Sequence, residues 1–577
     1  MRQNFDFDLI IKNAKIIDGT GNPWYYADIG ICGDTIVKIG DLQKNTSHRA
    51  INAGRRIVCP GFIDVHTHCD RGLGKNETTA NINYLSQGVT TVVAGNCGSG
   101  AFRIRKTRKQ WKKTGIGTNV VMQVGYGTIR AEVMGLLTRT PTKKEAARMK
   151  AILEQAMKEG AWGLSAAFQY IPDRYAATEE VMELVNVVAE SGGVFSCHLR
   201  SEGAELIEAV NEAIRIGEQT GVKINISHLK VSGKDNWGSL KIAAALISAA
   251  RERGIRISAD LFTYPQCVYS PLVMIFNIPD NMPPLENVER IIDYHYVAKR
   301  VGISVDDYFK SGSEKPILSS SPLDQYCEAL RNALKDYSKR KRIQELTQEG
   351  APDKLNWVPM FGWSSFTIVE SKNPELQGRT IADIAREYEK TPFDLAVEML
   401  NDEKNDLIIS VFTMSEEEIA SVIKNDYMMV GSDGGAAAFR PGTKGHPGLF
   451  GTFPRVLRKF VREEKLLTLE DAVRMITSLP AQFLGLRDRG LIREGYKADL
   501  VVFDPNEVQD NSTYSNSHQL STGFEYIILN GRICLERGSY NNTLNGRVLL
   551  QTSNGSLNRK NAENRSRKKF FQGEMIK

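Results

Sequence analysis

The chain has 577 residues, with 74 lysines and arginines against 68 aspartates and glutamates, so its formal net charge is +6. Apolar residues make up 41% of the sequence and charged residues 25%. These are ordinary values for a globular protein and exclude a disordered or fibrous chain. An excess of six positive charges over this length is too small to indicate a nucleic-acid-binding protein.

The sequence contains no uninterrupted apolar run of about 18 residues, the length that a transmembrane helix needs. Asp6 and Asp8 interrupt the stretch where a signal peptide would be apolar. Eight cysteines are scattered along the chain without a CxxC pair, which is typical of reduced thiols in a chain of this size. We therefore expect a cytoplasmic protein that contacts neither a membrane nor a nucleic acid.

Short alternating strands with turn signals occupy residues 8–58, and residues 496–550 resemble them. Neither segment is long enough to form a stable domain alone. We therefore expect the two ends, residues 1–58 and 491–551, to pair into one small β-sandwich domain.

Between these ends, apolar strand-like runs alternate with helical patterns. Continuous runs rich in Val and Ile are typical of strands buried on both faces of a parallel sheet. Eight such units predict an α/β protein with a TIM-like (β/α)8 barrel over residues 59–490. Periodicity alone leaves an open α/β sheet as the alternative. The runs cover residues 57–68, 88–98, 119–128, 161–168, 193–200, 222–230, 256–264 and 426–434.

Two segments depart from this pattern. Residues 270–400 combine helical patches with proline-rich turns, which predicts an insertion late in the barrel. Residues 552–577 are polar and carry seven basic against two acidic side chains, which predicts a basic disordered tail. Five of the six excess charges therefore belong to the tail, and the rest of the chain is nearly neutral.

Six side chains that can bind a metal lie at the C-terminal ends of predicted strands. The carboxyl ends of barrel strands meet at one mouth, where barrel enzymes place their chemistry. Imidazole, thiolate and carboxylate together are a ligand set that suits zinc. One such residue alone would be a weak signal, but six at the same end of successive strands predict a metal site. They are His66, His68, Cys97, His198, His228 and Asp433.

His48, His295 and His518 do not lie at the ends of predicted strands, and we interpret them as ordinary surface residues.

Several motifs follow in order along the chain: PGFIDVHTH, QGVTTVVAGNCG, HLRSEG, ISHLK, GSDGG, GTFPRVL and KADLVVFDP. Through them the sequence resembles the amidohydrolase superfamily and, within it, the N-acyl-D-amino-acid deacylases or D-aminoacylases. The likeness runs from about residue 8 to 549, and it implies a TIM-like barrel flanked by a β-sandwich built from both chain ends.

The resemblance also implies a metal-ligand assignment. Many superfamily members bridge two metals with a carboxylated lysine on the fourth strand, but the run AWGLSAAF has no lysine. In the deacylase family a cysteine takes that role, and Cys97 is in the matching place. One tight zinc ion would be held by Cys97, His198 and His228. A second, weaker position would be formed by His66, His68 and Asp433.

In the mechanism that the resemblance implies, zinc lowers the pKa of its water toward about 7 and polarises the amide carbonyl. Asp433 would be the catalytic residue that takes the proton of the water and passes it to the departing amine. Lys230 and Tyr264 would contact the substrate.

The segment after the catalytic aspartate is one place where the sequence departs from the family. Relatives carry His-Pro-Arg after the catalytic aspartate, and that arginine is expected to pair with the α-carboxylate of the substrate. This chain reads His446-Pro447-Gly448 and so lacks the fork-shaped cation that best matches a carboxylate. Arg440 and Lys444 on the same loop are the candidate replacements, and we select Arg440.

The sequence thus predicts a zinc-dependent amide hydrolase that releases a carboxylate and a D-amino acid from an N-acyl-D-amino acid. One alternative is a related hydrolase that acts on a cyclic amide, a cyclic imide or a small D-peptide. The other is a non-catalytic scaffold, which the presence of all six ligands disfavours.

Overall fold

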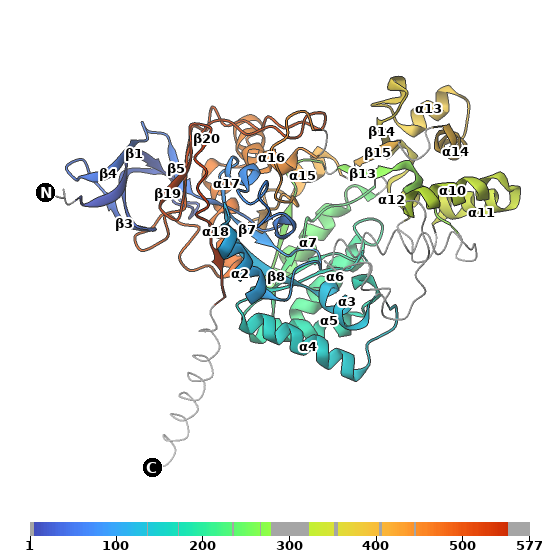
Figure 1. The fold of residues 1–577 in the computed structure, drawn as a ribbon, viewed down its shortest axis with the longest axis horizontal. Coiled ribbons are helices and arrows are strands. Elements are labelled where there is room, and N and C mark those ends of the chain that lie inside the picture. The colour runs from blue at the N-terminus through green and yellow to red at the C-terminus, as the bar shows by residue number, and fades with distance from the viewer. Residues whose placement is uncertain are drawn as a thin grey trace, which may run out of the picture.

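The computed structural model describes residues 5–551 except 136, 171, 234–235, 266, 279–321, 351–355, 403–406, 413 and 444–445. His295, Lys444 and the predicted tail, residues 552–577, therefore lie outside the described residues. Figure 1 shows a central barrel with a β-sheet from the chain ends on one side and a separate lobe on the other.

Eight parallel strands form the barrel, in the order β16-β12-β11-β10-β9-β8-β7-β6. A parallel bridge between Thr67 and Gly434 joins the chain beyond the two outermost strands, where His68 N donates to Gly434 O at 2.7 Å. The predicted TIM-like fold is thus confirmed. The strands are β6 (Phe62–Asp64), β7 (Val89–Ala94), β8 (Asn119–Gly125), β9 (Gly163–Ala167), β10 (Val194–His198), β11 (Lys223–Ile226), β12 (Ile257–Leu261) and β16 (Met428–Val430).

The first predicted run, residues 57–68, was expected to be one strand, and this expectation is wrong. It divides at Gly61 into β5 (Ile57–Pro60), which joins the sheet of the chain ends, and β6 in the barrel. A Cβ atom at Gly61 would lie 2.2 Å from Thr90 Oγ1, so only glycine allows this close passage between the two sheets.

Helices surround the barrel and bury their apolar faces against it. In α6, Leu206, Val210 and Ile214 are buried, and Gly221 ends the helix in the left-handed conformation, with φ of 66°. No described helix is long and apolar enough to cross a membrane. The helices are α1 (Ile82–Leu85), α2 (Ile104–Thr114), α3 (Tyr126–Met134), α4 (Lys143–Lys158), α5 (Thr178–Glu190), α6 (Leu206–Thr220), α7 (Ser239–Glu252), α15 (Glu416–Val422), α16 (Gly448–Arg455), α17 (Leu469–Ile476) and α18 (Ser478–Leu484).

The two chain ends were predicted to pair, and they share one nine-stranded sheet. Strand β5 pairs antiparallel with β17 (Leu500–Phe503), with Val58 opposite Val502. Strand β21 (Val548–Leu549) instead adds to β8 of the barrel. The other strands of the sheet are β1 (Phe7–Ile16), β2 (Tyr25–Cys32), β3 (Thr35–Gly40), β4 (Ser47–Asn52), β18 (Phe524–Leu529), β19 (Arg532–Glu536) and β20 (Ser539–Tyr540).

A lobe with its own hydrophobic core follows β12 and lies opposite the sheet of the chain ends in Figure 1. It contains a three-stranded antiparallel sheet in the order β13-β15-β14. Its elements are β13 (Cys267–Pro271), α10 (Pro322–Lys335), α11 (Tyr337–Glu349), α12 (Trp357–Phe361), β14 (Phe366–Glu370), α13 (Ile381–Glu387), α14 (Pro392–Asp402) and β15 (Ile408–Phe412). The domain limits at residues 58, 490 and 551 stay predictions.

Candidate metal centre

The six predicted ligands converge at the carboxyl end of the barrel. His198 is the last residue of β10, and the others lie in the loops that directly follow β6, β7, β11 and β16. His66 and His68 were expected on a strand, but β6 already ends at Asp64. The Asp64 carboxylate accepts a hydrogen bond from His66 N at 3.0 Å and so stabilises the bend that carries both histidines.

The ligand atoms form two groups that share one residue. In each group the nitrogen, sulfur and oxygen atoms lie within 4.8 Å of one another, and Cys97 belongs to both. A thiolate between two sets of ligands is the arrangement expected of a bridge between two metal positions. The first group is Cys97, His198 and His228, and the second is His66, His68, Cys97 and Asp433.

The second group has too many acceptors for its protons. His66 Nε2 lies 3.2 Å from Cys97 Sγ and 3.2 Å from Asp433 Oδ1, and His68 Nε2 lies 2.9 Å from the same oxygen. One N–H proton on His66 Nε2 cannot point at both a thiolate and a carboxylate. A cation placed among these atoms satisfies all of them, so the residues present fit a zinc ion.

The first group is oriented by contacts on the far sides of its rings. His228 Nε2 lies 3.7 Å from Cys97 Sγ, and the His198 and His228 rings are 4.4 Å apart. His228 Nδ1 lies 2.9 Å from Glu202 Oε1. A proton on Nδ1 then leaves the Nε2 lone pair directed toward Cys97, as a metal ligand requires.

Three of the ligands have strained backbones. The φ angles are 50° at Cys97, 37° at His228 and 53° at Asp433, in the left-handed region that residues other than glycine rarely adopt. Such a conformation costs about 1–3 kcal/mol per residue. The fold holds the three side chains in place against this cost, as is common at functional sites.

The buried charges of the cluster shift its pKa values. Burial disfavours ionisation of Asp433, but the charge of His66 and hydrogen bonds from His66 and His68 hold the pKa of Asp433 well below its usual range. The pKa of the Cys97 thiol is also lowered well below its usual value, because His66, His198 and His228 outweigh burial. Both shifts favour the ionised form of the group, which attracts a cation.

Two supporting carboxylates were missed in the sequence analysis. Glu202 Oε1 contacts His228 Nδ1 and lies 3.5 Å from His198 Nε2. Asp260 accepts a hydrogen bond from His228 N at 2.9 Å and lies 3.4 Å from His66 Nδ1. Both residues lie in motifs at strand ends, HLRSEG and SADLF. Their position at the ends of predicted strands is the feature of the sequence that could have identified them.

We predict that Glu202→Gln weakens zinc binding about 10- to 100-fold, because the neutral amide orients and polarises His228 less well than a carboxylate does. Competition with a chelator measures this affinity directly. Glu212→Gln is the matched control, since Glu212 pairs with Arg200 and belongs to neither ligand group. Unchanged zinc affinity in Glu202→Gln would contradict the positioning role.

The three predicted substrate contacts lie in different surroundings. Lys230 is buried, and its Nζ contacts Glu202 and lies 3.0 Å from His228 Nδ1. The buried Tyr264 hydroxyl donates to Asp510 Oδ2 at 2.5 Å. These contacts place Lys230 beside the ligand cluster, whereas the Tyr264 hydroxyl is held by a distant segment of the chain.

Arg440 is a surface residue in the structure. Its side chain is 68% exposed and pairs with Glu77 at 2.8 Å, and its backbone N donates to His518 Nδ1. The substrate-binding roles of Lys230, Tyr264 and Arg440 stay predictions.

A barrel with two zinc-compatible ligand groups at its carboxyl end defines a metal-dependent hydrolase of the amidohydrolase type. A model of the amidohydrolase family matches residues 393–534. D-aminoacylase from Alcaligenes xylosoxydans xylosoxydans is 30% identical over 571 residues, which cover 95% of this chain and 98% of the relative. The chain therefore belongs to the D-aminoacylase family of amidohydrolases, as the motifs predicted.

Two further relatives have related specificities. N-acyl-D-glutamate deacylase from Alcaligenes xylosoxydans xylosoxydans is 29% identical, with 91% of this chain and 93% of the relative covered. The crystal structure of N-acyl-D-glutamate deacylase from Bordetella bronchiseptica, complexed with zinc and a phosphonate inhibitor, is 27% identical. That comparison covers 94% of this chain and 99% of the other, with a TM-score of 0.69.

Proposed function

We propose that this protein is a zinc-dependent deacylase that hydrolyses N-acyl-D-amino acids to a carboxylate and a D-amino acid. The single observation that carries the proposal is the position of Cys97 in both ligand groups at the barrel mouth. The names of the relatives, a D-aminoacylase and N-acyl-D-glutamate deacylases, support the substrate class.

In this proposal the tight zinc position is formed by Cys97, His198 and His228, and the weaker position by His66, His68 and Asp433. Bound zinc would supply Lewis acidity and an acidified water at neutral pH. Glu202 and Asp260 lie on the far sides of the His228 and His66 rings, where each would accept the Nδ1 proton and leave the Nε2 lone pair for zinc.

Asp433 moves the proton in this mechanism. Its lowered pKa keeps the carboxylate ionised at neutral pH, ready to accept the proton of the attacking water. The same carboxyl group then passes the proton to the departing amine, because an amide nitrogen leaves poorly unless it is protonated. Lys230, beside the cluster, is the proposed contact for the substrate amide or carboxylate.

The partner of the substrate α-carboxylate must differ from the one in the family, because the motif that supplies it is changed in this chain. Gly448 begins α16, where the family carries the arginine of its His-Pro-Arg motif. We assign the carboxylate contact to Arg440, which would have to exchange Glu77 for the substrate. We also propose a cytoplasmic location, supported by the reduced state of the seven cysteines whose side chains the structure describes.

A substrate screen tests the proposal. We expect turnover of N-acetyl-D-amino acids, with the L enantiomers and cyclic imides hydrolysed far more slowly. Hydrolysis of cyclic imides in preference to open-chain amides would instead identify the alternative hydrolase. The absence of both zinc, by elemental analysis, and turnover would identify a non-catalytic scaffold.

A further inference from the structure

His198 has two ring nitrogens, and its neighbours decide which of them can bind a metal. A neutral imidazole carries one proton, so one nitrogen donates a hydrogen bond and only the other has a free lone pair. His198 Nε2 lies 2.8 Å from Gln169 Oε1. The same nitrogen lies 3.5 Å from Glu202 Oε1, which is longer than the usual hydrogen bond. Gln169 is therefore the nearer acceptor for a proton on His198 Nε2.

Glu202 is occupied by two other groups. Its Oε1 atom lies 2.9 Å from His228 Nδ1 and also contacts Lys230 Nζ. Both groups lie nearer to this oxygen than His198 Nε2 does. Glu202 therefore orients His228, and the orientation of His198 depends on Gln169.

The backbone holds Gln169 beside His198. Strands β9 and β10 are parallel neighbours, with Ala167 opposite His198. Phe168 N donates to His198 O at 3.1 Å, and Tyr170 N donates to Ala167 O at 2.9 Å. These two bonds form the turn that carries Gln169 past the end of β9. None of the six ligands comes from β9, so Gln169 brings this strand into contact with the metal centre.

Ring packing alone does not distinguish the two nitrogens of His198. The centroid of its ring lies 4.8 Å from that of Tyr170 and 4.4 Å from that of His228. A ring turned over about its bond to Cβ would fill nearly the same space. The hydrogen bond to Gln169 makes the difference, because it requires Nε2 on that side. His198 Nδ1 is buried and has no hydrogen bond within the described part of the chain, so its lone pair is available.

The chemistry of the site also fixes the orientation of the Gln169 amide. If the NH2 group faced His198, Nε2 would have to accept and the ring proton would move to Nδ1. A protonated Nδ1 cannot bind a metal. A zinc ligand at this position therefore requires the amide oxygen of Gln169 to face the ring, as the structure has it.

We propose that Gln169 is a positioning residue of the tight zinc position formed by Cys97, His198 and His228. Its Oε1 atom keeps the proton of His198 on Nε2, so that Nδ1 is the nitrogen that binds zinc. The two histidines then offer different nitrogens, since His228 offers Nε2. This inference rests on the zinc position of the proposed function but not on its substrate.

Competition between the full chain and a chelator for zinc tests this role. Gln169→Met keeps the length of the side chain but removes the amide oxygen, and it should bind zinc about 10- to 100-fold more weakly. Gln169→Glu keeps an acceptor oxygen at the same place and should bind zinc at least as tightly as the wild-type protein. A side chain that only filled space would be replaced by methionine without loss.

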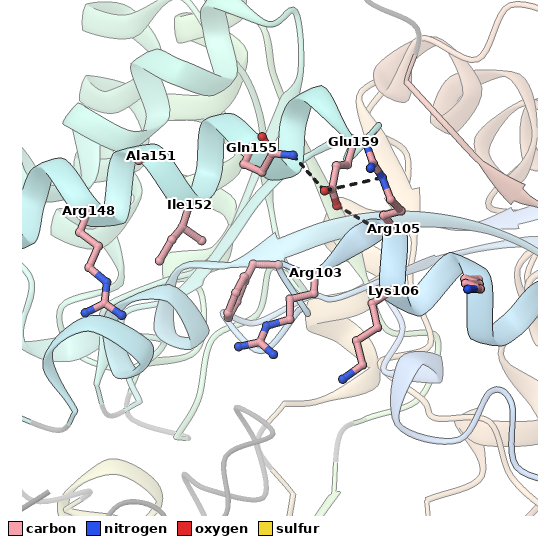
Figure 2. A pocket seen from close by; sticks show the side chains of 10 residues that line it. Arg103, Arg105, Lys106, Arg148, Ala151, Ile152, Gln155 and Glu159 are labelled. Atoms are coloured by element: carbon pink, nitrogen blue, oxygen red, sulfur yellow. Dashed lines mark hydrogen bonds and ion pairs between the residues drawn. The ribbon is translucent and has the colours of Figure 1, made fainter.

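Gln155→Met is the matched control. Figure 2 shows Gln155 on α4, where it donates to Glu159 Oε1 at 2.9 Å. It lines a groove of about 680 Å³ that shares no residue with the metal ligands. The variant loses one amide hydrogen bond, as Gln169→Met does, but we expect it to keep the wild-type affinity for zinc.

NMR of the histidine ring nitrogens in the zinc-loaded wild-type protein identifies the tautomer directly. The chain has eight histidines, so the ring signals are few. We expect the proton of His198 on Nε2. A proton on Nδ1 would overturn the proposal, and so would wild-type zinc affinity in Gln169→Met. Both measurements are made without substrate. A chain that shows the expected zinc affinities but does not hydrolyse N-acyl-D-amino acids would refute the proposed function and leave the role of Gln169 intact.

Discussion

Replacing Cys97 with serine is expected to remove zinc from both positions and to lower deacylase activity at least about a thousandfold. The Cys97 sulfur is the one ligand atom common to the two groups, so its loss breaks both at once. A serine hydroxyl keeps its proton at neutral pH and cannot replace a thiolate whose pKa the surrounding histidines have lowered. Elemental analysis and turnover measure the two effects.

Cys197→Ser is the matched control for this substitution. Cys197 precedes His198 on β10 and is buried, but burial raises the pKa of its thiol, and it belongs to neither ligand group. We expect this variant to keep its zinc. The shared-ligand interpretation fails if Cys97→Ser retains as much zinc as the wild-type protein.

The second large effect is expected for Asp433→Asn, which should lower kcat by about a hundredfold to ten-thousandfold. An amide has nearly the shape of the carboxylate but does not accept a proton at neutral pH. The group of Cys97, His198 and His228 is left intact, so about one zinc ion per chain should remain. Steady-state kinetics together with metal analysis separate proton transfer from metal binding.

Asp426→Asn makes the same chemical change at an exposed position just before β16 and should leave kcat unchanged. Near-wild-type turnover in Asp433→Asn would refute the proton-transfer role. Complete loss of zinc would show that Asp433 acts through metal binding instead.

The barrel could be predicted from the sequence because its strands are buried on both faces. Such strands are continuous runs rich in Val and Ile, which can be recognised without knowing which strands pair. In β7, all six residues are buried. The convergence of the six candidate ligands could be predicted for a related reason: the carboxyl ends of parallel strands meet at one mouth. The break at Gly61 could not be predicted from the sequence, because it depends on the side chain of Thr90 in a neighbouring strand.

Other features depend on contacts between distant segments. The Tyr264 hydroxyl is bound by Asp510, which lies 246 residues further along the chain. Glu202 becomes a support for the ligands only when β10 and β11 lie side by side. The left-handed backbone at Cys97, His228 and Asp433 is imposed by the surrounding fold. None of these residues is a glycine, so the sequence does not indicate this conformation.

The bridge between Thr67 and Gly434 that closes the barrel also brings the two ends of the barrel sequence together at the proposed second metal position. Cys97, His198 and His228 all lie in the first half of the chain. His66, His68 and Asp433 come from the first and last barrel strands, across the whole intervening lobe. The proposed second position therefore requires a closed barrel, so its metal occupancy would report barrel closure.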